Sequence, residues 1–194
     1  DRGLPGEVDD ATAAEIFLAV RGLARSVALS VESDLGSIVE MVHTVQPDIL
    51  HLCGPSGAVG PSEVADLRSL IGGVPIMQAI AVTGEDAVDA ARSFEPVVDY
   101  LILDSVDPEI DGIGAAGKVH DWSLSAAIVD AVDIPVVLAG GLSPENVAAA
   151  IAVVRPWGVD SLTHTNVRLG NGRFRKDLDR VASFVEAAHS EIRP

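Results

Sequence analysis

Short apolar runs alternate with amphipathic stretches along most of the chain. Six runs rich in Val, Ile and Leu occupy residues 25–31, 47–53, 74–80, 98–104, 134–140 and 158–164. Nearly continuous hydrophobicity over such short runs is typical of strands buried on both faces of a parallel sheet. Most successive runs begin roughly 25 residues apart, which is the length of a strand–loop–helix–loop unit. The pattern therefore predicts an α/β fold.

Helical spacing of apolar residues fills the stretches between these runs, and one such stretch precedes the first predicted strand. Helices are expected over residues 9–23, 33–44, 61–70, 86–93 and 145–154. An eight-stranded α/β barrel usually takes about 250 residues, and two further strand–helix units would bring the chain near that length. The chain begins with Asp1 rather than Met. We therefore expect a (β/α)8 TIM barrel whose first one or two units are missing from the sequence shown, with a six-stranded doubly wound sheet as the alternative.

Neither a linker run nor a low-complexity segment interrupts the pattern, so residues 1–194 are expected to form one domain. Two long loops are expected, over residues 105–120 and 163–176, and the second carries four of the thirteen basic residues. Long loops that follow strand ends are where α/β enzymes keep their sites.

Composition restricts the partners of the protein. Hydrophobic residues make up 48% of the chain but aromatic residues only 4%, so the core must be largely aliphatic. With 29 acidic and 13 basic residues, the formal charge of −16 argues against broad nucleic-acid or anionic-membrane surfaces. No membrane-spanning run or signal peptide is visible, and we expect a cytoplasmic protein. The scarcity of lysine fits either adaptation to high salt or an arginine-preferring genome.

Cofactor chemistry has little support in the sequence. Cys53 is the one cysteine, which excludes an internal disulfide and a cysteine-rich zinc site. No cluster of His, Asp and Glu has metal-ligand spacing, so we predict neither a metal nor another cofactor.

Candidate chemistry gathers where the predicted strands end, because the carboxyl ends of parallel strands share one edge of the sheet. Asp104 ends an apolar run, and a carboxyl group in such surroundings has a raised pKa and suits a general acid; the alternative is a carboxylate that caps the following loop. Cys53 suits a nucleophile or base, or simply a small core residue. These strand ends carry Cys53, Gln78, Asp104, Gly140, Gly141, Thr163 and His164.

Gly140 and Gly141 separate an apolar run from Ser143 and Pro144, which read as an N-cap and a first helical position. Glycine permits positive φ and leaves backbone amides bare, and a helix N-terminus attracts anions. We expect an anion between this turn and the loop that contains Thr163 and His164. A tight strand-to-helix turn without a ligand is the alternative.

Three motifs in the second half of the chain resemble phosphoribosylanthranilate isomerase, an eight-stranded α/β barrel of tryptophan biosynthesis. They are "LILDS…GIGAAGKVHDWSL", "PVVLAGGLSPENVAAAIAVVRPWGVDS" and "KDLDRVASFVEAA". The family pattern has an Asp that ends a strand, a G-[GS]-x-G-K-x-[FH]-D-W loop and L-[AS]-G-G-L-x-P-E-N-V. The resemblance covers about residues 47–188. It favours the barrel over the open sheet and implies that Gly140 and Gly141 bind a substrate phosphate.

The resemblance also implies a reaction, an Amadori rearrangement of an aminoaldose to an aminoketose. An acid protonates the furanose ring oxygen, the ring opens to a Schiff base, and a base removes the C2 proton. Asp104 matches the family acid. His51 and Cys53, in "LHLCG", match a substrate-binding V-Q-L-H-G segment, and Arg2 loosely matches an anthranilate-binding arginine. The substrate is therefore expected to be a small phosphorylated sugar, with oligomerisation left open.

Three departures from the family pattern leave other functions open. The family base is a cysteine in a K-x-C-G segment, which the sequence does not contain. His51 replaces a glutamine and Cys53 a histidine of the pattern. His164 replaces a glycine of the last phosphate loop, where it would either crowd a phosphate or bind it as a cation. A barrel acting on another sugar phosphate, or a ligand-binding or assembly protein without catalysis, are the alternatives.

Overall fold

Six parallel strands form one sheet in which each strand pairs with the next one along the chain. The computed structural model describes residues 6–106, 112–114, 117–169 and 174–191. The strands are β1 (Val27–Ser30), β2 (Ile49–Leu52), β3 (Ile76–Ala81), β4 (Tyr100–Asp104), β5 (Val136–Leu138) and β6 (Gly158–Val159). Each of the six predicted runs coincides with one of them, although β3 extends one residue beyond its run, and this confirms the α/β prediction.

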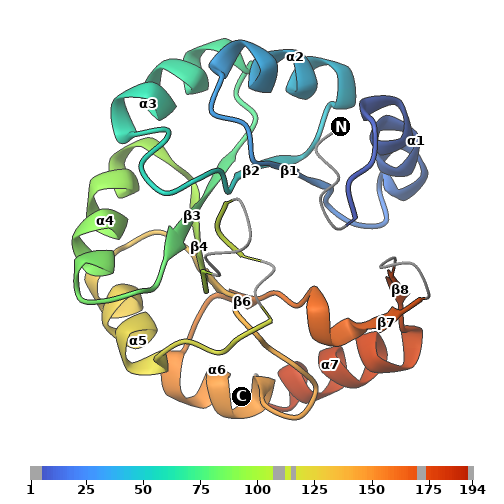
Figure 1. The fold of residues 1–194 in the computed structure, drawn as a ribbon, viewed down its shortest axis with the longest axis vertical. Coiled ribbons are helices and arrows are strands. Elements are labelled where there is room, and N and C mark those ends of the chain that lie inside the picture. Colours follow the sequence, from blue (N-terminus) through green and yellow to red (C-terminus); the bar gives the residue numbers. More distant parts are fainter. Residues whose placement is uncertain (1–5, 107–111, 115–116, 170–173, 192–194) are drawn as a thin grey trace.

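Helices lie along the outside of the curved sheet (Figure 1). They are α1 (Asp10–Val20), α2 (Leu35–Val45), α3 (Pro61–Leu70), α4 (Asp86–Phe94), the short 3-10 helix η1 (Glu95–Val97), α5 (Trp122–Ala131), α6 (Val147–Val154) and α7 (Leu178–Ser190). A doubly wound sheet has helices on both faces and a reversal in strand order. The sequential strand order and the one-sided helices therefore rule out that alternative.

Aspartates begin several of these helices. Asp34 accepts a hydrogen bond from the Ser37 amide at 2.8 Å, and Asp177 accepts from two amides of the first turn of α7. Such N-caps satisfy amides that lack a partner within the helix. The excess of acidic residues thus contributes locally to helix formation.

The core has two layers because successive side chains of a strand point to opposite faces of the sheet. The larger layer fills the space between sheet and helices and includes the fully buried Ile38, Leu50, Leu67, Leu101 and Leu138. Burial of each such side chain stabilises the fold by about 1.5–3 kcal/mol. The smaller layer lies on the inner face and comprises Ile49, Cys53, Met77, Ala79, Ile102, Val137 and Ala139. Its small residues near the carboxyl ends of the strands leave room there for a site.

Two predicted elements near the carboxyl terminus of the chain are wrong. The strand expected over residues 158–164 ends at Val159, and a 3-10 helix, η2 (Thr163–Thr165), follows. The loop expected over residues 163–176 instead contains this helix and an antiparallel pair, β7 (Asn166–Arg168) and β8 (Phe174–Lys176). Asp177 N donates to Thr165 O at 2.9 Å, which fixes the base of the pair.

The helix expected to begin at Pro144, with Ser143 as its N-cap, also begins later, at Val147. Ser143 Oγ accepts from the Glu145 amide at 3.2 Å, while Asn146 Oδ1 accepts from the Ser143 amide at 2.8 Å. Ser143 therefore closes a turn that precedes the helix, and Asn146 is its N-cap residue.

The sheet is open at both edges within the described residues. β1 pairs only with β2, and β6 pairs only with β5. Two apolar side chains on the inner face of β1 are consequently exposed, Val27 by 42% and Leu29 by 59%. In Figure 1, α1 (blue) and the β7–β8 pair (red) lie at the two ends of the arc.

Candidate active site

Asp104 is the last residue of β4, and its half-buried carboxyl group belongs to the inner face of the sheet. Burial raises its pKa to about 7; the Ser105 amide, which donates to Oδ1 at 2.7 Å, opposes this shift, and the Asp160 carboxylate adds to it. A carboxyl group with this pKa carries a proton in a substantial fraction of molecules at neutral pH. Asp104 can therefore donate a proton, as a general acid must.

A short glycine-containing segment covers Asp104 and Cys53. Ile113 N donates to Cys53 O at 3.0 Å, and Gly114 N donates to Ser105 O at 3.1 Å. A Cβ on Gly114, whose φ is +107°, would lie 2.6 Å from Asp104 Oδ2. Only glycine allows both this backbone conformation and this close approach. The backbone of this segment therefore packs directly against the carboxyl group of Asp104.

His51 in β2 and Cys53 directly after it lie on the inner face of the sheet. Burial and the nearby Asp104 raise the pKa of the Cys53 thiol to about 12. The thiol stays protonated and cannot act as a base near neutral pH. Burial lowers the pKa of His51 to about 4, and its buried Nε2 has no hydrogen-bond partner among the described residues. Both groups are neutral, and their expected contact with substrate stays a prediction.

Asp160 is a further carboxylate at this edge that the sequence analysis did not single out. It follows β6 directly, just as Asp104 ends β4, and that parallel is the signal that could have found it. The surrounding protein raises its pKa, and Lys176 opposes the shift, although the side chain still meets solvent. Asp160 therefore disfavours a second negative charge on Asp104.

The turn that contains Gly140 and Gly141 lies beside Asp104. Their φ values are +81° and +65°, and a Cβ on Gly141 would lie 2.6 Å from the carbonyl carbon of Lys118. Within the described residues, the amides of Gly141 and Leu142 make no hydrogen bond to protein. Bare amides at such a turn are suited to binding an anion.

A small cavity of about 20 Å³ joins this turn to Asp104 and to the loop after β6. Its lining includes Gly117 and the four residues expected to bind phosphate: Gly140, Gly141, Thr163 and His164. The sequence analysis thus placed these residues together correctly. On this measure about 10–15 Å³ suffices for one water, so the cavity holds a water molecule and is small for a phosphate group.

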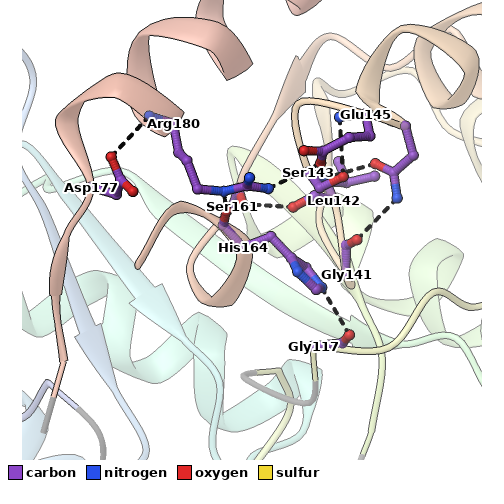
Figure 2. A network of polar contacts seen from close by, with 10 residues as sticks. Gly117, Gly141, Leu142, Ser143, Glu145, Ser161, His164, Asp177 and Arg180 are labelled. Carbon is purple, nitrogen blue, oxygen red and sulfur yellow. Dashed lines mark hydrogen bonds and ion pairs between the residues drawn. The ribbon is translucent and has the colours of Figure 1, made fainter. Parts of the chain in front are cut away.

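His164 and Arg180 tie the walls of this cavity together (Figure 2). His164 Nε2 donates to Gly117 O at 3.1 Å, which directs the imidazole at the segment that follows β4. Arg180 donates from Nε to His164 O at 2.6 Å and from a terminal nitrogen to Glu145 at 3.0 Å. Ser161 Oγ donates to Leu142 O at 2.6 Å. The two proposed anion-binding loops therefore form one braced unit.

Two other candidates from the sequence do not join this site. Gln78 lies in the middle of β3 and shares the outer face with Ile76 and Ile80, so its placement at a strand end is wrong. Its amide instead lines a separate cavity of about 110 Å³ between the loops after β2 and β3. Arg2 lies outside the described residues. The described part of the chain contains neither three grouped metal-ligating side chains nor a helix able to cross a membrane.

Comparison with known proteins supplies the family. A family model described as "N-(5'phosphoribosyl)anthranilate (PRA) isomerase" matches residues 4–187. The chain belongs to the phosphoribosylanthranilate isomerase family. The N-(5'-phosphoribosyl)anthranilate isomerase of Haloferax volcanii is 35% identical over 187 residues, which are 95% of this chain and 77% of that protein.

Two further members show how far the likeness extends. N-(5'-phosphoribosyl)anthranilate isomerase 2 of Methanosarcina mazei is 42% identical over 129 residues, covering 66% of this chain but only 55% of that protein. The crystal structure of phosphoribosyl anthranilate isomerase from Thermotoga maritima matches with a TM-score of 0.75 and 27% identity, covering 94% of this chain and 82% of that one. The resemblance seen in the sequence is thereby confirmed at the level of the family.

Proposed function

We propose that this protein isomerises N-(5'-phosphoribosyl)anthranilate to the corresponding aminoketose in tryptophan biosynthesis. The observation that carries the proposal is the position of Asp104, a carboxyl group with a pKa of about 7, beside a turn of bare backbone amides. An acid within reach of an anion-binding turn suits a phosphorylated sugar whose ring must be opened. Membership of the family supports the same substrate.

In the proposed reaction, the proton on Asp104 passes to the furanose ring oxygen, and the bond between this oxygen and C1 breaks. The nitrogen lone pair forms the C1=N bond of a Schiff base. A base then removes the C2 proton, and the electron pair of the C2–H bond forms the enol-amine, which tautomerises to the ketose. Asp160 supports the first step because its negative charge keeps the proton on Asp104. The amides of Gly141 and Leu142 hold the phosphate.

Cys53 is unsuited to the role of the base, because its thiol is buried and its pKa is about 12. We propose that the base lies on a further strand that closes the sheet into an eight-stranded barrel. Two features support the closure: β1 and β6 each lack a second neighbour among the described strands, and Val27 and Leu29 expose apolar side chains on the inner face. Relatives that match most of this chain extend beyond the matched part.

The assembly of the protein stays a prediction. One solved relative is described as monomers generated from the dimeric phosphoribosylanthranilate isomerase of Thermotoga maritima. We propose that this protein acts on its small substrate without a cofactor, and sedimentation at several concentrations measures whether it forms an oligomer.

Turnover of N-(5'-phosphoribosyl)anthranilate by the full-length gene product tests the proposal. We expect conversion to the ketose, and Asp104→Asn should lower kcat by about 10²-fold or more because it keeps the shape but removes the proton source. Asp130→Asn is the control, since Asp130 pairs with Arg155 on the exposed surface. Turnover of a different sugar phosphate would instead favour a paralogue. Binding without turnover would favour a protein without catalysis.

A further inference from the structure

The imidazole ring of His120 contacts Ser105, the residue that follows Asp104. Each of its two ring nitrogens lies within hydrogen-bond distance of a serine hydroxyl. Its Nδ1 is 3.0 Å from Ser105 Oγ, and its Nε2 is 2.7 Å from Ser125 Oγ. Ser105 and Ser125 are buried, Ser125 completely. A buried hydroxyl without a partner costs about 1–3 kcal/mol, so neither contact is incidental.

The available protons determine the tautomer of His120. Ser105 Oγ lies 2.6 Å from Lys118 O, and because a carbonyl only accepts, the serine must donate its single proton there. Nδ1 of His120 therefore donates to Ser105 Oγ. In a neutral imidazole Nε2 then accepts from Ser125 Oγ. Burial lowers the pKa of His120, which agrees with a neutral ring.

Ser105 connects this histidine to the proposed acid. Its amide donates to Asp104 Oδ1 at 2.7 Å, and its carbonyl accepts from Gly114 N, the backbone that lies against Asp104 Oδ2. Every displacement of Ser105 therefore moves the groups that orient the Asp104 carboxyl group.

The same histidine also contacts the glycine turn. A Cβ on Gly140 would lie 2.7 Å from His120 Nδ1 and 2.6 Å from Ser105 Oγ. Gly140 is thus required partly because the histidine–serine pair occupies the space of a side chain. His120 holds the end of β4 and the turn after β5 at a fixed separation.

We propose that His120 is a positioning residue of the isomerase reaction, which fixes Ser105 through Nδ1 and thereby aligns the Asp104 carboxyl group with the ring oxygen of the substrate. The inference rests on the proposed function and adds a residue to it. His120 does not itself touch the reacting atoms. Its Nε2 contact with Ser125 anchors the ring to α5, while its Nδ1 contact affects the chemistry.

Three substitutions separate the two contacts. The amide of His120→Asn reaches the place of Nδ1 and can donate to Ser105 Oγ. The longer His120→Gln reaches toward Ser125 but bypasses Ser105. His120→Phe fills the space and bonds to neither serine; because the family pattern also has Phe at this position, an unchanged kcat in this variant would overturn the proposal.

Steady-state kinetics of the full-length protein distinguishes positioning from packing. We expect Gln and Phe to lower kcat by at least about 10-fold, within the range caused by misplacement of about 1 Å, with KM nearly unchanged. Asn should restore most of kcat. Ser105→Ala should cause a similar loss and add nothing to His120→Gln. Equal kcat values for Asn and Gln, or additive effects of Ser105→Ala and His120→Gln, would overturn the proposal.

Nitrogen-15 NMR of the imidazole tests the same contact without turnover. The wild-type ring should be neutral with its proton on Nδ1, and Ser105→Ala should perturb that nitrogen more than Nε2. A proton on Nε2 would overturn the inference even in a fully active enzyme. Failure of the wild-type protein to turn over the substrate would instead contradict the proposed function and leave the NMR result to be judged separately.

Discussion

Aspartates at the two ends of the parallel strands have pKa values that are shifted in opposite directions. At the amino ends of the strands, Asp99 accepts two hydrogen bonds from Arg68, at 2.7 and 2.8 Å, and one from the Ile76 amide at 2.8 Å. These contacts hold its pKa below the usual value. At the carboxyl ends, Asp104 has one amide donor, and its pKa is raised to about 7.

This difference has two causes: burial, which is the main reason for the raised pKa of Asp104, and hydrogen-bond donors, which lower the pKa of Asp99. Asp48 repeats the first arrangement, because Ser26 donates to it from both its amide and its hydroxyl and lowers its pKa. Asp160 repeats the second. In α/β barrels, side chains at the amino ends of strands serve stability, and those at the carboxyl ends serve catalysis. Here the carboxylates with more donors are also the less buried ones, and both differences distinguish the two ends.

The largest loss of stability is expected at the amino ends, from Asp99→Ala. Without the carboxylate, the amide of the fully buried Ile76 and the guanidinium of Arg68 lose their acceptor. An unsatisfied buried donor costs about 1–3 kcal/mol, which urea denaturation at pH 7 measures as a lowered free energy of unfolding. The loss should shrink as the pH falls, because the lowered pKa stabilises the fold only while the folded-state carboxyl group is ionised.

Asp130→Ala provides the control for Asp99→Ala. Asp130 also pairs with an arginine, but both side chains are about two-thirds exposed, at 66% and 67%. Exposed pairs contribute about 0–1 kcal/mol. If the two substitutions lowered the free energy of unfolding equally, the hydrogen bonds of Asp99 would contribute no more to stability than the exposed ion pair of Asp130.

An effect of opposite sign is expected from Asp104→Asn. The raised pKa means that the folded state keeps the proton while the unfolded chain, with an ordinary value of about 3.9, releases it. The stability of the wild-type protein should therefore fall as the pH rises from about 4 to about 7 and then level off. The asparagine variant lacks this penalty, and should be the more stable protein at pH 8 but not at pH 4.

Denaturation of both proteins across this range measures the difference. A constant gap at all pH values would show that Asp104 has an ordinary pKa. A variant that is less stable than wild type at pH 8 would show that the carboxylate is stabilising, like Asp99. Either result would contradict the proposed difference in pKa between the aspartates at the two ends of the strands.

Much of this contrast could be predicted from the sequence, because it depends on local order. Apolar runs of about seven residues located the six strands, and Asp104 stood out as a carboxylate that ends one of them. The β7–β8 pair was missed although Asn171 and Gly172, between short alternating runs, are an ordinary hairpin signal. That segment was interpreted only as a loop after a strand.

Other features depend on contacts between distant residues and leave no local pattern. His120 meets Ser105 only because the chain returns to the same place after fifteen residues, whereas Ser125 is five residues further on. Gln78 was predicted to lie at a strand end because its apolar run stops at residue 80. The prediction did not specify which face of the sheet the side chain occupies. The alternation of inner and outer faces, which places Gln78 toward the helices, is set by pairing with β2 and β4.

The smallest expected effect concerns His164, which lines the same cavity as Asp104 at the carboxyl ends of the strands. Its Nε2 is engaged by Gly117 O, and the cavity beside it is only about 20 Å³. Because phosphate is larger than this space, we expect it to displace the ring and break this hydrogen bond when it binds the amides of Gly141 and Leu142. A hydrogen bond of this kind contributes about 0.5–1.5 kcal/mol net.

We accordingly expect His164→Gly to raise the affinity for inorganic phosphate by about 2–10-fold, the equivalent of that free energy. Calorimetric titration at about pH 5.5 and about pH 8.5 measures it. The gain should be similar at both pH values, because the ring blocks the cavity whether or not it is charged. His189→Gln, on α7, removes a histidine away from the cavity and serves as the control. A loss of affinity confined to the lower pH would show instead that a cationic His164 binds the phosphate.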